Sequence, residues 1–334
     1  MSAERSPQAG LAAFLAKEWG TAVEIENLSV ASAGARRLNL LFDAVRGGER
    51  VPLVATIIPN AALQIMPIEV EASHLRFAEA AGMPAPHVHA VCDDASWVGG
   101  PFFLSSRVAG ETIPRQILRL VESQPGLGPR LARQCGEALA KLHAADPRAH
   151  PRLGAAAGDP IEASLRAAEA LVRGLLQPSP AFTLALRTLE RERPPAPPRL
   201  TVVHGDFRNG NLIVDRTGLC AALDWEICHA GDPMEDLGWL CQRMWRFRND
   251  ALEVGGFGAR ADLVAGYTAA GGRFDAERFR WWKALGTLRW GLGLAGQAKA
   301  HLDGSVPSIV MAASGRRVAE LEWDVLMLLR RSFA

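Results

Sequence analysis

One short stretch of the sequence brings together an acid, an amide and a guanidinium group that can converge on a single substrate hydroxyl. The stretch is HGDFRNGNLIVD, residues 204–215. A carboxylate such as Asp206 can accept a proton from a hydroxyl, and the amide oxygen of Asn211 is a ligand suited to Mg²⁺. Arg208 can stabilise negative charge on a transferred group. These residue types at this spacing predict phosphoryl-transfer chemistry.

Short apolar runs flank the stretch and must position it. TVV before it and LIV within it predict two paired strands with the loop between them, and a further strand, CAAL, ends just before Asp224 in ALDWE. Mg²⁺ takes one or two protein carboxylates together with phosphate oxygens and water, so Asp224 and Asn211 form a sufficient protein set. Each residue alone is more often an ordinary turn residue. The joint pattern has little reason to arise from packing, and it favours transfer from a nucleotide.

The joint pattern resembles the aminoglycoside phosphotransferase family, the small-molecule relatives of protein kinases, which also includes choline, homoserine and hydroxyacyl-CoA kinases. With Gly205 in place of an arginine, four residues match the kinase catalytic loop H-R-D-x-K-x-x-N: His204, Asp206, Arg208 and Asn211. Asp224 matches the metal-binding aspartate of D-F-G. The resemblance extends through residues 101–110, 139–146, 231–240 and 315–322. HGDFRxGN, LDWE and GDPxxDL together are typical of a subgroup similar to the kinase-like domain fused to certain acyl-CoA dehydrogenases.

The resemblance implies an α+β, protein-kinase-like fold with two lobes. Residues 1–108 would form a small antiparallel sheet with a helix that covers the nucleotide, and residues 109–334 a large helical lobe. It also implies ATP and Mg²⁺ and a small-molecule hydroxyl as acceptor. The implied roles are catalysis for Asp206 and Arg208, magnesium binding for Asn211 and Asp224, and structural support for His204 and Asp236. Asp236 would brace the catalytic loop through its backbone, cap a helix N-terminus, or do both.

The small lobe departs from the family pattern at the residue that should hold the nucleotide phosphates. The strand LVATIIP carries no lysine or arginine, although Glu71 falls where its partner glutamate is expected. Arg36 or Arg37 could reach the same space and pair with Glu71, or both could be solvated turn residues. Ser32 and Gly34 could offer backbone N–H groups to phosphate, or belong to an ordinary hairpin turn. By the resemblance, the adenine would bind backbone groups near Ser106 to Val108.

Hydrophobic periodicity predicts the elements that carry these residues. Strands are expected at ENLSV, RLNLLFDAV, RVPLVATII, HVHAVCDD and PFFLSSRV. Helices are expected at residues 8–19, 69–81, 114–124, 128–144, 160–176, 180–192, 235–247, 260–270, 276–299 and 307–332. The order predicts a sheet-rich lobe followed by a helical one.

Composition bounds the class of protein. The chain has 334 residues, of which 49% are hydrophobic, so it can bury a substantial core. A formal net charge of +1 argues against nucleic acid or a membrane surface as partner. The sequence has five cysteines without a CxxC pair, no signal-peptide pattern and no apolar run of about 18 residues, which together predict a cytoplasmic protein. The oligomeric state is left open.

The C-terminal region bears on the acceptor. From residue 241 onward there are 14 Arg and Lys against 9 Asp and Glu. A polycationic aminoglycoside calls for the opposite sign, whereas an apolar acceptor with an anionic group, such as a hydroxyacyl-CoA, suits this excess. The run RFRWWKALGTLRW could contribute to that site, but Trp281, Trp282 and Trp290 are better explained as helix core, with Arg280 and Arg289 on its solvated face. An aminoglycoside phosphotransferase and a nucleotide-binding pseudokinase remain as alternatives.

Overall fold

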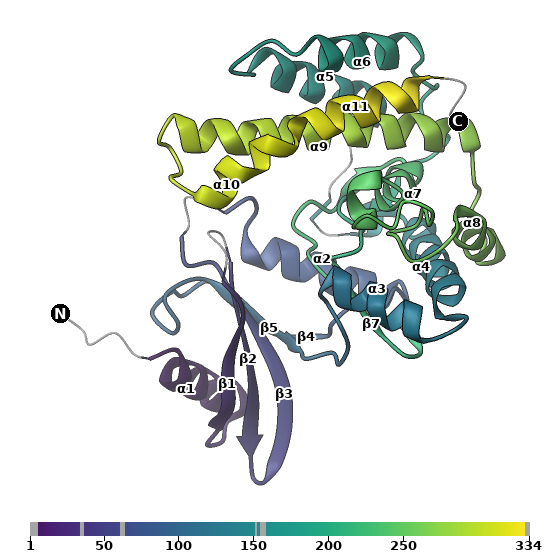
Figure 1. Ribbon diagram of the computed structural model, residues 1–334. Coiled ribbons are helices and arrows are strands. Elements are labelled where there is room, and N and C mark those ends of the chain that lie inside the picture. The colour runs from purple at the N-terminus through teal and green to yellow at the C-terminus, as the bar shows by residue number, and fades with distance from the viewer. Residues whose placement is uncertain (1–5, 34–36, 61–63, 151, 154–157, 331–334) are drawn as a thin grey trace.

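A five-stranded antiparallel sheet forms the small lobe. The computed structural model describes residues 6–33, 37–60, 64–150, 152–153 and 158–330. The strands follow the order β1-β2-β3-β5-β4 (Figure 1). Their bounds are β1 Glu24–Ala33, β2 Leu38–Arg46, β3 Glu49–Ile57, β4 Val88–Cys92 and β5 Phe102–Ser106. All five strands that the sequence predicted in this lobe are therefore present.

Helix α1, Pro7–Trp19, covers one face of this sheet. Ser6 accepts a hydrogen bond from the backbone N–H of Ala9, Pro7 opens the helix, and Gly20 ends it with a left-handed φ of 67°. The buried helix residues Leu11, Phe14 and Leu15 pack into a hydrophobic cluster with the inward-facing strand residues Phe42, Leu53, Phe102 and Leu104. This cluster is the core of the small lobe.

Helix α2, Ile68–Ala80, belongs to a different core. Its buried residues Ile68, Ala72 and Leu75 lie in the large hydrophobic cluster that also contains Leu139, Phe207 and Trp225. In Figure 1, α2 lies between the sheet and the large lobe. Because α2 packs against the large core, its position is tied to the segments that carry the motif residues. A division between lobes at residue 108 stays a prediction.

The large lobe is helical. Its α-helices are α3 Pro114–Ser123, α4 Leu127–Ala144, α5 Pro160–Arg173, α6 Pro180–Arg191, α7 Met234–Leu240, α8 Arg260–Ala269, α9 Ala276–Leu302, α10 Ile309–Ser314 and α11 Val318–Leu329. Proline stands at the start of α3, α5 and α6, where the missing N–H costs nothing. The side chains of Asp159, Ser179 and Asp275 cap α5, α6 and α9. Figure 1 shows α9 and α11 packed together, with α5 and α6 on one side of them.

Four short strands carry the motifs, and their pairing corrects one expectation. β6, Thr201–Val203, pairs with β9, His229–Gly231, whereas β7, Leu212–Asp215, pairs with β8, Gly218–Ala222. The prediction that the strands flanking the loop pair with each other was wrong. The three residues of β9 carry no strand pattern, and their pairing with β6 comes from tertiary structure.

Two predicted helices are interrupted. The helix expected at 235–247 ends at Leu240 and is followed by a short 3₁₀ helix, η3, Arg243–Arg246. The helix expected at 307–332 is split between α10 and α11 by a 3₁₀ turn, Gly315–Arg317. None of the described helices combines the length and apolar character needed to cross a membrane.

Candidate active site

The loop from His204 to Asn211 is fixed by its backbone. Gly205 has a φ of 84°, and a Cβ atom there would lie 2.7 Å from the carbonyl oxygen of Ile227, so a side chain does not fit. The two carboxylate oxygens of the fully buried Asp236 accept hydrogen bonds of 2.8 Å from the N–H groups of His204 and Gly205. Asp236 therefore makes the backbone contacts that the resemblance implied. Asp232, rather than Asp236, accepts from the first N–H of α7.

His204 links the loop to the D-W-E segment. Its Nε2 lies 3.1 Å from the carbonyl oxygen of Leu223, and its Nδ1 accepts a hydrogen bond of 3.2 Å from the N–H of Asp206. The ring packs on Trp225 with 4.4 Å between ring centroids. Burial lowers the pKa of His204. A neutral imidazole with Nε2 as donor satisfies both contacts, which suits a structural role.

Asp206 accepts hydrogen bonds from three side chains. Nε of Arg208 lies 3.0 Å from Oδ1, the indole N–H of Trp239 donates to Oδ1 at 2.7 Å, and Nδ2 of Asn211 donates to Oδ2 at 2.6 Å. A carboxylate offers about four lone-pair sites, so these donors orient the group and leave room for a substrate hydroxyl. Burial raises the pKa of Asp206, and the charge of Arg208 opposes that rise.

The oxygen atoms of Asn211 and Asp224 fit a magnesium ion. The amide nitrogen of Asn211 is committed to Asp206, which leaves its oxygen as the available ligand atom. A backbone hydrogen bond of 2.8 Å from Leu223 to Asn211 brings Asp224 beside it. Oδ1 of Asp224 is buried and accepts no hydrogen bond. No cluster of three His, Cys, Asp or Glu side chains suited to a metal occurs among the described residues, and Mg²⁺ held partly by phosphate oxygens needs none.

Arg37, just before β2, makes the pairing with Glu71 that the sequence left open. Its guanidinium group donates to both oxygens of Glu71, at 2.9 and 3.0 Å. The same group lies 2.7 Å from Glu226 and 3.3 Å from Oδ1 of Asp224. Of the two arginines that the sequence offered, Arg37 makes the pairing with Glu71, and Arg36 lies outside the described residues. One guanidinium thus faces three carboxylates, and the excess negative charge suits a divalent cation.

His74 of α2 contacts the D-W-E segment directly, and Glu71 of the same helix reaches it through Arg37. Burial raises the pKa of Glu71 to about 7, and the neighbouring Asp224 and Glu226 add to the rise while Arg37 opposes it. One turn later, Nδ1 of His74 contacts the carbonyl oxygen of Trp225 at 3.1 Å. Burial lowers the pKa of His74 to about 4, so the neutral ring donates from Nδ1. The orientation of Asp224 is therefore coupled to the position of α2.

The other small-lobe residues predicted to contact the nucleotide are Ser32, Gly34 and the segment from Ser106 to Val108. Ser32 lies in β1 opposite Asn39, and Gly34 falls outside the described residues. In the expected adenine segment, the N–H of Ser106 donates to the carbonyl oxygen of His87 and that of Arg107 to Pro52. Val108, half-buried, is the residue of the three whose N–H is not used in this way.

A tryptophan cluster that the sequence pattern did not predict lies beside Asp206. Trp239, Trp245 and Trp290 pack with centroids 5.0 to 6.1 Å apart, and the guanidinium of Arg208 lies 4.5 Å from the centre of the Trp245 ring. Trp281 and Trp282 are buried, as expected for helix core. The presence of Trp239 in GDPMEDLGWL was visible, but only the fold shows its contact with Asp206.

Comparison with known families identifies the chain. A model of the phosphotransferase enzyme family matches residues 28–282. The chain belongs to that family. The family membership predicted from the loop motif is thereby confirmed. The motif residues 204–224 lie inside the matched segment.

Curated and solved relatives agree with this family. The chain is 27% identical to acyl-CoA dehydrogenase family member 10 of Mus musculus over 80% of its own length. It is 28% identical to family member 11 of Gallus gallus over 64% of its length. It spans only 26% and 28% of these two relatives. A likeness to part of certain acyl-CoA dehydrogenase proteins was expected from the sequence motifs.

Solved phosphotransferases share the fold. A Ralstonia eutropha protein assigned to the aminoglycoside phosphotransferases matches with a TM-score of 0.72 at 22% identity, covering 96% of this chain and 98% of the other. Aminoglycoside phosphotransferase APH(4)-Ia, crystallised with AMP-PNP and hygromycin B, matches with a TM-score of 0.67 at 19% identity, covering 96% and 98% of the two chains. The predicted α+β, two-lobed, kinase-like fold is confirmed.

Proposed function

We propose that this phosphotransferase-family protein transfers the γ-phosphoryl group of ATP to a hydroxyl of a small molecule, with Mg²⁺ as cofactor. The observation that carries the proposal is the convergence of three side chains on the Asp206 carboxylate beside the oxygen atoms of Asn211 and Asp224. A related fold crystallised with AMP-PNP and hygromycin B supports a nucleotide and a small acceptor as the two substrates.

Each residue has a distinct part in the proposed reaction. Asp206 orients the acceptor hydroxyl and takes its proton as the new oxygen–phosphorus bond forms and the bond between the β- and γ-phosphates breaks, releasing ADP. Arg208 offsets charge on the transferred group. Asn211 and Asp224 hold magnesium, which when bound neutralises charge on the β- and γ-phosphates. Arg37, steadied by Glu71, replaces the lysine in contacting the nucleotide phosphates.

A hydroxyacyl-CoA is the acceptor that we propose first. The excess of positive charge from residue 241 onward favours an acceptor with an anionic group. The curated relatives that the chain matches are named as acyl-CoA dehydrogenase family members. An aminoglycoside or other antibiotic is the second candidate, supported by the hygromycin B complex of APH(4)-Ia. A catalytically inactive pseudokinase is less favoured, since Arg37 supplies the positive charge whose absence would have argued for it.

The decisive experiment is a screen of hydroxyl-bearing metabolites, including hydroxyacyl-CoAs, aminoglycosides and macrolides, for Mg²⁺-dependent release of ADP. We expect one acceptor class to stimulate release in the wild type and none to do so in Asp224→Ala. Nucleotide binding without transfer to any hydroxyl acceptor would instead favour the pseudokinase.

A further inference from the structure

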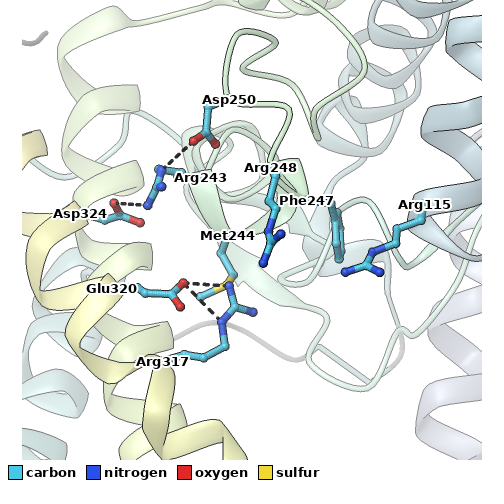
Figure 2. A pocket seen from close by; sticks show the side chains of 9 residues that line it. All are labelled: Arg115, Arg243, Met244, Phe247, Arg248, Asp250, Arg317, Glu320 and Asp324. Carbon is cyan, nitrogen blue, oxygen red and sulfur yellow. Dashed lines mark hydrogen bonds and ion pairs between the residues drawn. The ribbon is translucent and has the colours of Figure 1, made fainter.

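A pocket rich in arginine lies outside the residues assigned so far. It has a volume of about 370 Å³ and opens between the start of α3, the loop after η3, and α11. Figure 2 shows the side chains that line it. They are Arg115, Arg243, Met244, Phe247, Arg248, Asp250, Arg317, Glu320 and Asp324. We call this site the arginine pocket.

Each carboxylate of the arginine pocket is ion-paired with an arginine of the pocket, and the lining carries four arginines against three carboxylates, a net charge of +1. Arg243 lies 3.1 Å from both Asp250 and Asp324. Arg317 lies 3.0 Å from Glu320. Arg115 and Arg248 make no ion pair with any residue in the described part of the chain, and Figure 2 draws them on the two sides of the Phe247 ring. Two guanidinium groups are therefore available to an anion, next to an aromatic face.

The backbone of the arginine pocket is strained where these groups are presented. Phe247 and Arg248 are consecutive non-glycine residues with left-handed φ angles of 49° and 76°. Such a conformation costs free energy and persists where the surroundings enforce it, often at binding sites. Arg246 enforces it here by donating hydrogen bonds to the carbonyl oxygens of Cys241 and Asp250, which span the loop. These bonds hold the backbone from which the exposed side chain of Arg248 extends.

The arginine pocket adjoins the catalytic loop on two sides. Met244 lines it, and the next residue, Trp245, stacks on Arg208, which in turn contacts Asp206. On the other side, Arg115 follows Pro114, whose ring lies 3.5 Å from where a Cβ of Gly210 would stand. The arginine pocket therefore borders residues that contact the catalytic loop, on the side of the tryptophans and on the side of Pro114.

We propose that the arginine pocket binds a phosphate or diphosphate group that the acceptor carries at a distance from its reacting hydroxyl. This inference rests on the proposed function and names the acceptor class as phosphate esters. Guanidinium groups match phosphate in geometry and bind it through paired charge-assisted hydrogen bonds. The volume lies in the range of small-molecule sites and exceeds what a single ion needs, so it admits the group next to the phosphate, which Phe247 can stack.

The binding test uses inorganic phosphate as probe, with AMP-PNP and Mg²⁺ present so that the nucleotide phosphates occupy their own site. Calorimetry should show phosphate binding to the wild type and at least tenfold weaker binding to the double variant Arg115→Gln/Arg248→Gln. Arg316→Gln removes the same charge next to the pocket but outside it, and should change the affinity less than twofold. Absence of phosphate binding to the wild type, or equal affinity in the double variant, overturns the proposal.

The kinetic test compares alcohols with their phosphate esters, using glycerol with glycerol 3-phosphate and pantetheine with 4′-phosphopantetheine. The wild type should prefer the esters at least tenfold in kcat/KM, the double variant should lose that preference, and the KM for ATP should stay within twofold. Equal use of both members of every accepted pair overturns the inference and leaves the proposed function intact. Phosphate binding retained without transfer to any acceptor rejects the proposed function and the acceptor class that rests on it, and leaves the pocket as a phosphate-binding site only.

Discussion

The indole N–H of Trp239 donates a hydrogen bond of 2.7 Å to Oδ1 of Asp206. This contact joins α7 to the catalytic loop. Asp236 of the same helix also bonds to the loop, through the backbone N–H groups of His204 and Gly205. One short helix thus fixes both the main chain of the loop and the carboxylate that we assign as base.

Replacing Trp239 by phenylalanine should shift the pH dependence of the reaction. The lost hydrogen bond lowers the pKa of Asp206 in the wild type, so its removal raises that pKa further and moves the acidic limb of kcat/KM to higher pH. We expect kcat to fall about five- to tenfold, from a bond worth about 1 kcal/mol. Trp290→Phe, which packs against Trp239 without contacting Asp206, is the control. An unchanged acidic limb in Trp239→Phe would show that the contact has no influence on the base.

Replacing Arg37 by alanine should weaken ATP binding about tenfold or more, because it removes the guanidinium that faces Glu71, Asp224 and Glu226. Arg37→Lys should be intermediate, since it keeps the charge and loses the paired geometry. The measurement is nucleotide affinity by calorimetry, with Arg50→Ala, which removes an exposed arginine of β3, as control. Wild-type affinity in Arg37→Ala would refute the substitution of arginine for the missing lysine.

The raised pKa of Glu71 predicts how stability varies with pH. The folded-state pKa is about 7 and the ordinary value is 4.5, so the folded protein binds more protons between these limits. The contribution of Glu71 to stability is therefore full below pH 4.5 and declines as the pH rises to 7. It amounts to about 3 kcal/mol by linkage, at about 1.4 kcal/mol per pH unit.

The measurement is urea unfolding of the wild type and Glu71→Gln at pH 5 and pH 8. The wild type should lose more stability than Glu71→Gln on going from pH 5 to pH 8, because glutamine does not titrate. Glu69→Gln, in the same turn of α2, is the matched control and should behave like the wild type. Parallel pH profiles for the wild type and Glu71→Gln would contradict the assigned pKa.

Replacing Asp236 by alanine should leave the buried N–H groups of His204 and Gly205 without acceptors and Nε2 of His143 without its partner. Each unsatisfied buried group costs about 1 to 3 kcal/mol, so we expect a lower melting temperature and a fall in kcat of at least tenfold. Glu277→Ala, an exposed acid at the start of α9, should have neither effect. Wild-type kcat in a folded Asp236→Ala would mean that the loop holds its shape by other contacts.

The sequence predicted most of the elements and the motif residues because their signals are local. Proline and capping residues mark the helix starts, alternation marks the strands of the small lobe, and the loop motif ends nine positions before Asp224. The pairing of β6 with β9 and the contact of Trp239 with Asp206 join segments about 30 residues apart, so no local pattern encodes them. The sequence could not decide between Arg36 and Arg37 as the partner of Glu71, because that pairing depends on how the chain before β2 packs against α2.

The most direct test of the central claim is transfer of the γ-phosphoryl group from labelled ATP to an acceptor by the wild type and by Asp206→Asn, with nucleotide affinity measured in parallel. Asparagine keeps the size of the side chain but cannot take the proton, so we predict Mg²⁺-dependent transfer by the wild type, a fall of at least about 100-fold in the variant, and ATP affinity within twofold. Transfer by Asp206→Asn at the wild-type rate would contradict the account.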